Sequence, residues 1–96
     1  MKIIKLLSKV GSFAENKDKA RDIRLTEIIP SLEKNEEVVL DFGGIESATQ
    51  SFIHALMSDL IRKQGIEVLD KISFKNCNET TKKIINIVVD YMQETD

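Results

Sequence analysis

The apolar segment Val38–Phe42 and the two glycines after it constrain the fold more than any other part of the sequence. Four of its five residues are apolar, and the exception is Asp41. A short, nearly continuous apolar run is typical of a strand buried on both faces, as at the centre of a parallel sheet. We therefore predict a strand over residues 36–42 that ends at Gly43 and Gly44.

Strand-like and helix-like segments alternate on both sides of this strand. Short helical connections between strands imply mostly parallel pairing, with antiparallel pairing of the first strand as an alternative. The sequence thus predicts an α/β fold, a small mixed, mostly parallel β-sheet flanked by about three helices. The expected order is strand 2–7, helix 17–32, strand 36–42, helix 51–63, strand 68–74 and helix 82–93.

The first predicted helix begins after Asn16, whose side chain is suited to accept a backbone N–H at a helix start. Pro30 lacks a backbone N–H and its ring disfavours a continuous helix, so we expect an end or a kink near Ile29. Four apolar residues recur at spacings of three and four and predict one buried stripe, namely Leu25, Ile28, Ile29 and Leu32.

The second predicted helix has the clearest apolar face, with His54 and Ser58 on the opposite, polar side. Gly65 follows it and is suited to a left-handed helix cap. The apolar face contains Phe52, Ile53, Leu56, Met57, Leu60 and Ile61.

The last segment contains many β-branched residues, which favour a strand, but its length and the spacing of Asn86 and Asp90 favour a helix. Asn78 is expected to cap this helix. The apolar face is wide and therefore needs more than one neighbour. It packs either against the sheet and another helix or against a partner, including a second copy of the chain in a homodimer.

Length and composition narrow the class of protein. The chain of 96 residues supports a single domain, residues 1–96, with one cysteine and one histidine. This composition excludes an internal disulfide and argues against a metal site, a cofactor and an enzyme. Its beginning lacks the pattern of a signal peptide and no apolar run is long enough to span a bilayer, so we expect a cytoplasmic protein.

The charge is distributed unevenly but gives no sign of nucleic-acid binding. Residues 1–35 carry eight Lys or Arg and five Asp or Glu, and the remainder carries six and eleven. Lysine and aspartate alternate closely after Asn16, which is typical of a solvated helix face. The chain has no basic block and no tryptophan, and aromatic residues do not interleave with the basic ones.

The loop after the central strand carries Ser47, Thr49, Gln50 and Ser51 into the start of the second helix. Backbone N–H groups at a helix start are unpaired and favour an anion or a phosphorylated hydroxyl. The alternative interpretation is that these hydroxyls are structural helix caps. The two glycines do not have the spacing of a phosphate-binding loop.

Other polar side chains are expected to have structural roles. Asp41 is expected to accept backbone N–H groups of the following loop, with a general base or metal ligand as the alternative. His54 is expected to be solvated, without a partner to orient it for catalysis. Cys77 is expected to fill a half-buried position, although a helix start is able to lower the pKa of a thiol.

The segment 38–45, followed by Gln50, Ser51 and Phe52 at the start of a helix, resembles the STAS domain of sulfate transporters and anti-sigma factor antagonists. It is most similar to the bacterial branch described as a STAS-like domain of unknown function. The segment 74–79 resembles that branch's exit from its last strand, and the resemblance covers about residues 12–92. That branch often has Ser-Arg at the start of its first helix, where this sequence has Asn16 and Lys17.

The resemblance implies regulation through protein contacts and no catalysis. In the antagonists, the second of two hydroxyl residues before a glycine is phosphorylated by a partner kinase, and that position corresponds to Ser51. Thr49 stands at the position of an acidic residue, Gln50 at the first hydroxyl and Phe52 at the glycine. The implied partner is a GHKL-type ATPase or kinase. An alternative from the residues alone is a small anion or nucleotide bound at the helix start after Gly43 and Gly44.

Overall fold

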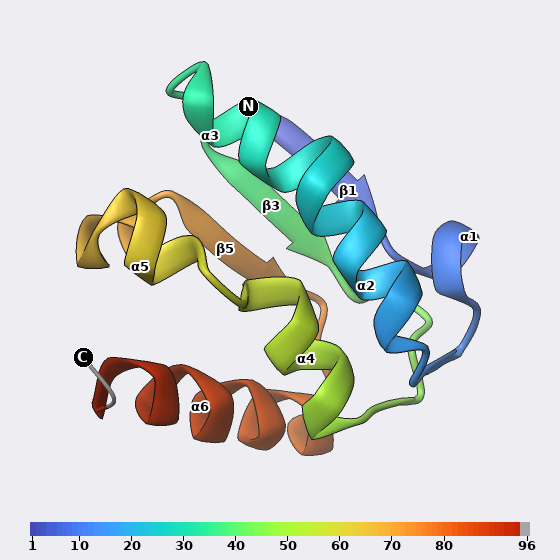
Figure 1. Cartoon of the computed structure of the whole chain (residues 1–96). Helices are drawn as coiled ribbons and strands as arrows, with labels where there is room; N and C mark the ends of the chain where they lie inside the picture. Colours follow the sequence, from blue (N-terminus) through green and yellow to red (C-terminus); the bar gives the residue numbers. More distant parts are fainter. Residues whose placement is uncertain (95–96) are drawn as a thin grey trace.

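The computed structural model describes residues 1–94 and contains a parallel sheet with helices packed over one side of it (Figure 1). The sheet has the strand order β1-β3-β5, from Lys2–Lys5, Val38–Asp41 and Ile72–Lys75. Both pairs are parallel, so the predicted α/β fold with a mostly parallel sheet is confirmed, and the antiparallel alternative for the first strand is wrong.

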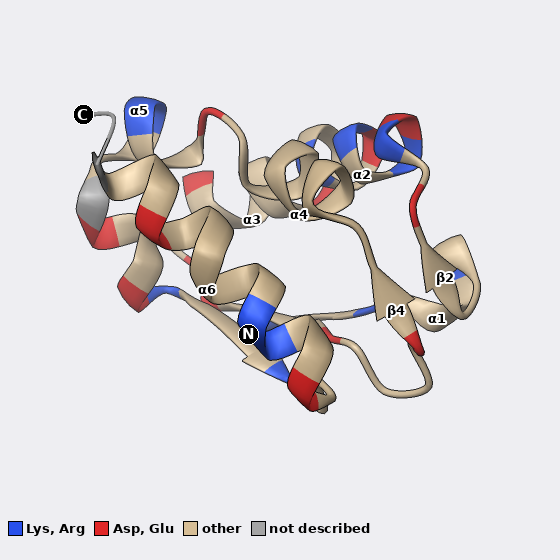
Figure 2. Cartoon of the chain, turned by 90° about the horizontal axis from the view of Figure 1, so that it is seen from below, with Lys and Arg blue, Asp and Glu red and all other residues tan. Residues whose placement is uncertain are grey.

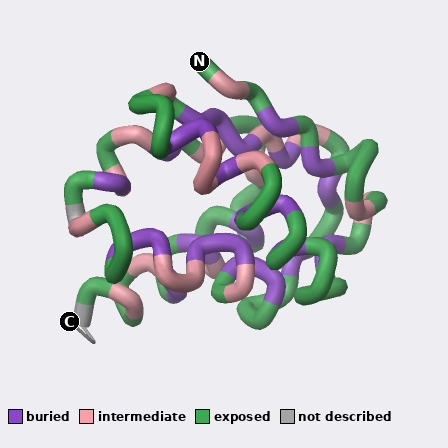
Figure 3. The backbone as a smooth tube through the Cα atoms, turned by 45° about the horizontal axis from the view of Figure 1, so that its top comes forward, coloured by how far each residue is buried: buried purple, intermediate pink, exposed green. Residues whose placement is uncertain are grey.

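Alternate residues of the strands face the helices. Ile4, Leu40 and Phe74 are partners in register and pack in the hydrophobic core. Their neighbours Ile3 and Ser73 lie on the opposite side of the sheet and are exposed. Figure 3 shows the buried residues concentrated between the sheet and the helices. The central strand is buried at Val38, Val39 and Leu40, as its apolar run predicts.

The first helix runs through Pro30 without ending there. It consists of α2 (Lys17–Ile23), the π-helical segment η1 (Arg24–Ile28) and α3 (Ile29–Glu33). A π turn is wider than an α turn and accommodates the proline ring, so the expected irregularity lies in η1 and not in a helix end. The extra residue in this turn shifts the helix face. Leu25 is therefore exposed and Arg24 is buried, contrary to the predicted stripe.

The second predicted helix is broken in two. It consists of α4 (Gln50–Met57) and α5 (Leu60–Gln64), separated by Ser58 and by Asp59, which has a positive φ of 65°. Its six apolar residues are all buried, as expected. Gly65 has the expected positive φ, 85°, but an extended ψ of 167° and not a left-handed helical one.

The remaining elements differ at their ends from the prediction. The 3₁₀ helix η2 (Ile66–Asp70) replaces the first part of the predicted strand 68–74. The strand in this region is therefore limited to β5. The segment after β1 forms the short helix α1 (Leu7–Val10) instead of continuing the strand to residue 7. The last helix, α6 (Glu79–Glu94), is confirmed and packs beside α4. Within residues 1–94, no helix is both long and apolar enough to span a membrane.

Two further strands, β2 (Phe13–Ala14) and β4 (Ser47–Ala48), form a separate parallel pair that the sequence does not predict. Each contributes only two residues, too few to produce an alternating pattern. This pair directly precedes α2 and α4 and determines how the two helices start.

Candidate functional site

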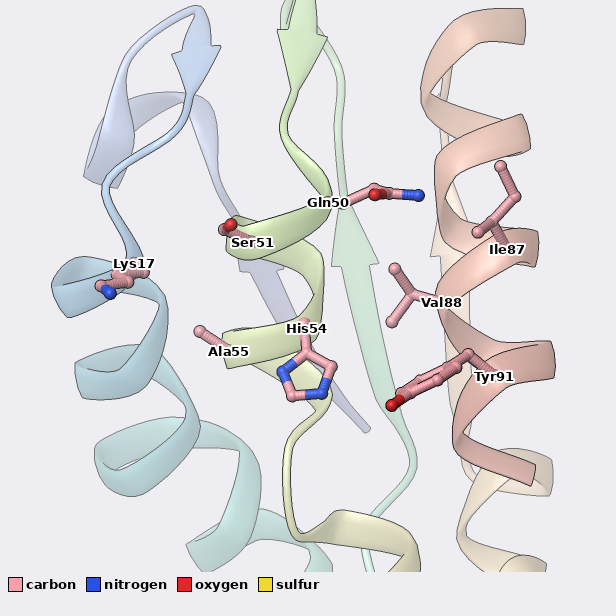
Figure 4. A pocket seen from close by; sticks show the side chains of 8 residues that line it. All are labelled: Lys17, Gln50, Ser51, His54, Ala55, Ile87, Val88 and Tyr91. Atoms are coloured by element: carbon pink, nitrogen blue, oxygen red, sulfur yellow. The ribbon is translucent and has the colours of Figure 1, made fainter. Parts of the chain in front are cut away.

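The β2–β4 pair aligns the starts of α2 and α4. Ala14 lies opposite Ala48, and the Thr49 N–H donates to the Ala14 carbonyl at 3.0 Å. Counting three residues on from each paired alanine leads to Lys17 in α2 and to Ser51 in α4. The first turns of the two helices therefore lie side by side, and Figure 4 shows Lys17 and Ser51 on them.

The hydroxyl residues of the predicted helix start have different positions. Thr49 is the N-cap of α4, and its Oγ1 accepts the Phe52 N–H at 3.0 Å. Ser47 lies in β4 and is exposed, outside the helix. Ser51 is exposed in the first helical turn, and its hydroxyl makes no hydrogen bond within residues 1–94. Of the three residues, Ser51 is the one that lies within α4.

Asn16 caps α2 in the same way. Its Oδ1 accepts the N–H groups of Asp18 at 2.9 Å and Lys19 at 3.1 Å. In the first turn of α4, the N–H groups of Gln50 and Ser51 make no hydrogen bond to any described residue. Such free amides carry partial positive charge, so the start of α4 favours a negative group.

The exposed side of α4 has two flanks. Figure 4 shows Ser51 and Ala55 on the flank towards α2, and Gln50 and His54 on the flank towards α6. A cavity of about 570 Å³ extends over this surface. Eight residues from three helices line it, namely Lys17, Gln50, Ser51, His54, Ala55, Ile87, Val88 and Tyr91.

The α6 side of the cavity is apolar. Ile87 and Tyr91 are 52% and 57% exposed, although both are large and hydrophobic. The Tyr91 ring lies 6.5 Å from the His54 ring, measured between centroids. His54 is exposed, as predicted, but it has this aromatic neighbour from another helix. Exposed apolar side chains at the edge of a cavity are typical of a binding surface.

The central helix of this surface is uncharged. Gln50–Met57 contains no Lys, Arg, Asp or Glu. Figure 2 shows α4 in tan beside α2, where both charge signs alternate. A new charge on α4 would therefore change its local electrostatics strongly.

Asp41 has the structural role that the sequence predicts. Its Oδ1 accepts the Gly43 N–H at 2.8 Å and an Asn76 amide N–H at 3.0 Å. These two hydrogen bonds, with smaller contributions from Lys5 and Lys75, hold the Asp41 pKa below its ordinary value. The carboxylate thus connects the ends of β3 and β5 and stabilises the loop before β4.

Gly43 and Gly44 shape that loop and lie away from the cavity. Gly44 has a φ of +82°, and a Cβ there would lie 2.6 Å from the Leu7 Cδ2 atom. Gly43 has no positive φ, but a Cβ would approach Asp41 Oδ1 to 3.1 Å. Both glycines are therefore explained by the turn and by close contacts.

The comparisons with known proteins identify the family. The family model described as a STAS-like domain of unknown function matches residues 21–82, more than half of the chain. The chain belongs to this family. Neither a curated protein nor a solved structure matches it.

The matched part of this STAS-like domain contains β3, the loop, and α4 with Ser51. Lys17, Ile87 and Tyr91 lie outside the matched residues, and the structure brings them to the same cavity. The residue pattern around the loop is sufficient to select Ser51 as a candidate site residue. No local pattern indicates its neighbours, because they come from helices distant in the sequence.

The described residues of the STAS-like domain also bear on metal binding and on the role of Cys77. Residues 1–94 contain no group of three His, Cys, Asp or Glu side chains placed to hold a metal ion. Cys77 is half-buried, and burial is the largest influence on its pKa, which is raised. The raised pKa disfavours the thiolate and supports the interpretation of Cys77 as a filler.

Proposed function

We propose that this chain is a non-enzymatic regulatory module that binds another protein, with Ser51 as the residue that controls binding. The observation that carries this proposal is the position of Ser51. The residue is exposed on the first turn of α4, its hydroxyl makes no hydrogen bond to any described residue, and it lines the cavity that Ile87 and Tyr91 border.

The binding surface consists of the exposed side of α4 and the neighbouring side of α6. Ile87 and Tyr91 would supply apolar contact area, and aromatic residues of this kind are frequent anchors in protein interfaces. Gln50 lies between these residues and Ser51 and adds donors and acceptors. A partner that covers this surface would therefore contact the first turn of α4, whose other flank carries Ser51.

Phosphorylation of Ser51 would act on this surface through charge. In the reaction, Ser51 Oγ forms a bond to the γ-phosphorus of ATP and the bond from that phosphorus to the β-phosphate oxygen breaks. ADP leaves and the hydroxyl proton is released. The product adds a charge of about −1.5 to −2 to a helix that has none. The partner proposed for this step is the GHKL-type ATPase or kinase that the resemblance implies.

The test uses the purified chain and a GHKL-type ATPase or kinase encoded beside its gene. We expect ATP-dependent addition of one phosphate, placed on Ser51 by mass spectrometry and abolished by Ser51→Ala. Calorimetry should show that the GHKL-type protein binds the unmodified chain. Its affinity for the phosphorylated chain and for Ser51→Asp should be at least tenfold weaker. Failure of Ser51→Ala and Ser51→Asp to change either phosphate incorporation or affinity would reject control at this residue.

Ser47→Ala is the matched control, because Ser47 is an exposed serine outside α4. It should be phosphorylated and bound like the original chain. Tyr91→Ala tests the apolar surface separately from Ser51. It should weaken binding of the GHKL-type protein although the Ser51 hydroxyl is still present.

A second candidate function is binding of a small anionic ligand, favoured by the cavity that joins Lys17 and the start of α4 to the Tyr91 ring. A nucleotide has matching chemistry, with phosphates for the helix start and a base for the ring. A thermal-shift screen tests this candidate, because a ligand at 100 times its Kd stabilises the chain by about 2.7 kcal/mol. No shift with nucleotides or phosphates would reject it.

A further inference from the structure

We propose that Lys17 is the intramolecular partner of a phosphate on Ser51, so that modification joins the first turns of α2 and α4. This inference rests on the proposed function, since it concerns the regulation of Ser51. It goes beyond that function because it assigns the receiving residue, which lies outside the part of the chain matched by the family.

The backbone register brings the two residues together. The pairs Phe13–Ser47 and Ala14–Ala48 place β2 and β4 in parallel, directly before the two helices. Lys17 and Ser51 each follow their paired alanine by three residues. The hydrogen bond from the Thr49 N–H to the Ala14 carbonyl continues this alignment up to the N-cap of α4.

The two helical segments also contact each other further along. The Arg24 guanidinium Nη1 donates to the Ala55 carbonyl at 2.7 Å, and Arg24 is only 8% exposed. Arg24 lies two turns after Lys17, and Ala55 lies one turn after Ser51. The Thr49–Ala14 and Arg24–Ala55 hydrogen bonds therefore hold α4 against the first helix before and after the turn that carries Ser51.

The Ser51 side chain lies on the side of α4 that faces α2. In Figure 4, Ser51 lies on the flank of α4 that faces α2, whereas Gln50 lies on the flank that faces α6. A phosphate on Ser51 would thus extend towards α2, the helix that begins at Lys17, and away from the apolar side chains of α6.

The charges between the starts of α2 and α4 fit a phosphate. Lys17 is exposed and makes no ion pair with any residue between 1 and 94, so its ammonium group is available. The free amides at the start of α4 add partial positive charge. Glu15 and Asp18 flank Lys17 in the sequence and oppose this attraction, so removal of Lys17 should leave a site that no longer favours the phosphate.

The test installs phosphoserine at position 51 during translation, so that no kinase is needed. A kinase that fails to modify the chain would contradict the proposed function and leave this experiment unaffected. Melting temperatures are compared with and without the phosphate in the original chain and in Lys17→Gln, Lys17→Arg and Lys19→Gln. Lys19 is the matched control, because it is an exposed lysine of α2 that lines a different cavity with Lys9 and Asp22.

We expect the phosphate to raise Tm by about 2–5 °C more in the original chain than in Lys17→Gln. Lys17→Arg should retain the difference, and Lys19→Gln should behave like the original chain. In 1 M salt, where the screening length is about 3 Å, the difference should shrink, as an ionic contact requires. A phosphate that changes Tm equally in the original chain and in Lys17→Gln, or in neither, would overturn the proposal.

Discussion

Two hydroxyl residues at the start of α4 lie two positions apart and have separable roles. Thr49 accepts the Phe52 N–H and caps the helix, whereas Ser51 is exposed and its hydroxyl has no hydrogen-bond partner among residues 1–94. The sequence predicts that hydroxyls gather here, but it leaves open which of them is the cap. The backbone decides, because only Thr49 has the extended conformation, with φ −83° and ψ 158°, that an N-cap requires.

This difference predicts opposite behaviour of two alanine variants. Thr49→Ala should lower the free energy of unfolding by about 1 kcal/mol, because the Phe52 N–H loses its acceptor. Ser51→Ala should change it by less than about 0.5 kcal/mol, as is usual for an exposed side chain. Urea unfolding monitored by circular dichroism measures both values. Equal losses in the two variants would show that Ser51 also has a capping role.

Asp41 predicts how stability depends on acid. Its pKa is lowered by the hydrogen bonds from Asn76 and Gly43, so the folded state favours the carboxylate. The resulting stabilisation is present above the ordinary carboxyl pKa of 3.8 and is lost as the pH falls below it. Asp41→Asn keeps an acceptor but does not ionise. We expect its free energy of unfolding to fall less than that of the original chain between pH 5 and pH 3.

Glu27 supplies the comparison for this experiment. Burial raises its pKa, but Lys9 and Lys2 outweigh burial and lower it overall. Glu27→Gln should therefore also reduce the acid sensitivity, and the double variant should reduce it further. A pH profile of Asp41→Asn identical to that of the original chain would contradict the role of Asp41.

At the scale of elements, the predictable parts are those with a strong hydrophobic pattern. The apolar run of β3 and the stripes of α4 and α6 are sufficient to locate these elements, because burial determines them locally. The break between α4 and α5 has no such signal, since neither Ser58 nor Asp59 is a glycine or proline. Its cause lies in another element.

Arg24 explains the break. In an uninterrupted helix the Ala55 carbonyl would accept the Asp59 N–H, but here it accepts Arg24 Nη1. The π turn of η1 brings Arg24 into this position and turns Leu25 outward. A buried arginine that binds a helix C-terminus cannot be recognised from the sequence, because it depends on how two helices pack.

We therefore expect Arg24→Ala to lower the free energy of unfolding by about 2–3 kcal/mol, through lost packing and a lost charged hydrogen bond. Arg24→Met, which keeps the length of the side chain, should lose less. Hydrogen exchange should show altered protection at residues 58–60 in both variants. Arg21→Ala is the control, because Arg21 is exposed on the same helix. Equal stability of Arg24→Ala and Arg21→Ala would contradict the assigned role.

At the scale of the whole molecule, the candidate site combines α2, α4 and α6 around one cavity. The loop and Ser51 are predictable, because they are contiguous and have a family pattern. Lys17 and Tyr91 are separated from Ser51 by 34 and 40 residues, and only the β2–β4 register and the packing of α6 bring them near it. The position of Ser51 at a helix start is thus predictable from the sequence, whereas its surroundings are a property of the fold.

The exposed side of α6 is also the surface through which the sequence predicts a homodimer. Ile87 and Tyr91 lie one turn apart and are both more than half exposed, so a second copy would contact them first. A dimer formed through α6 should become a monomer in Ile87→Asp, measured by sedimentation. Ile87 is the appropriate position, because Val88 is only 5% exposed and its substitution by a charge would disturb the core. Unchanged Tm in Ile87→Asp would show that the fold is intact. A chain that already sediments as a monomer, or a dimer that survives this substitution, would contradict the homodimer and leave the surface to a different protein.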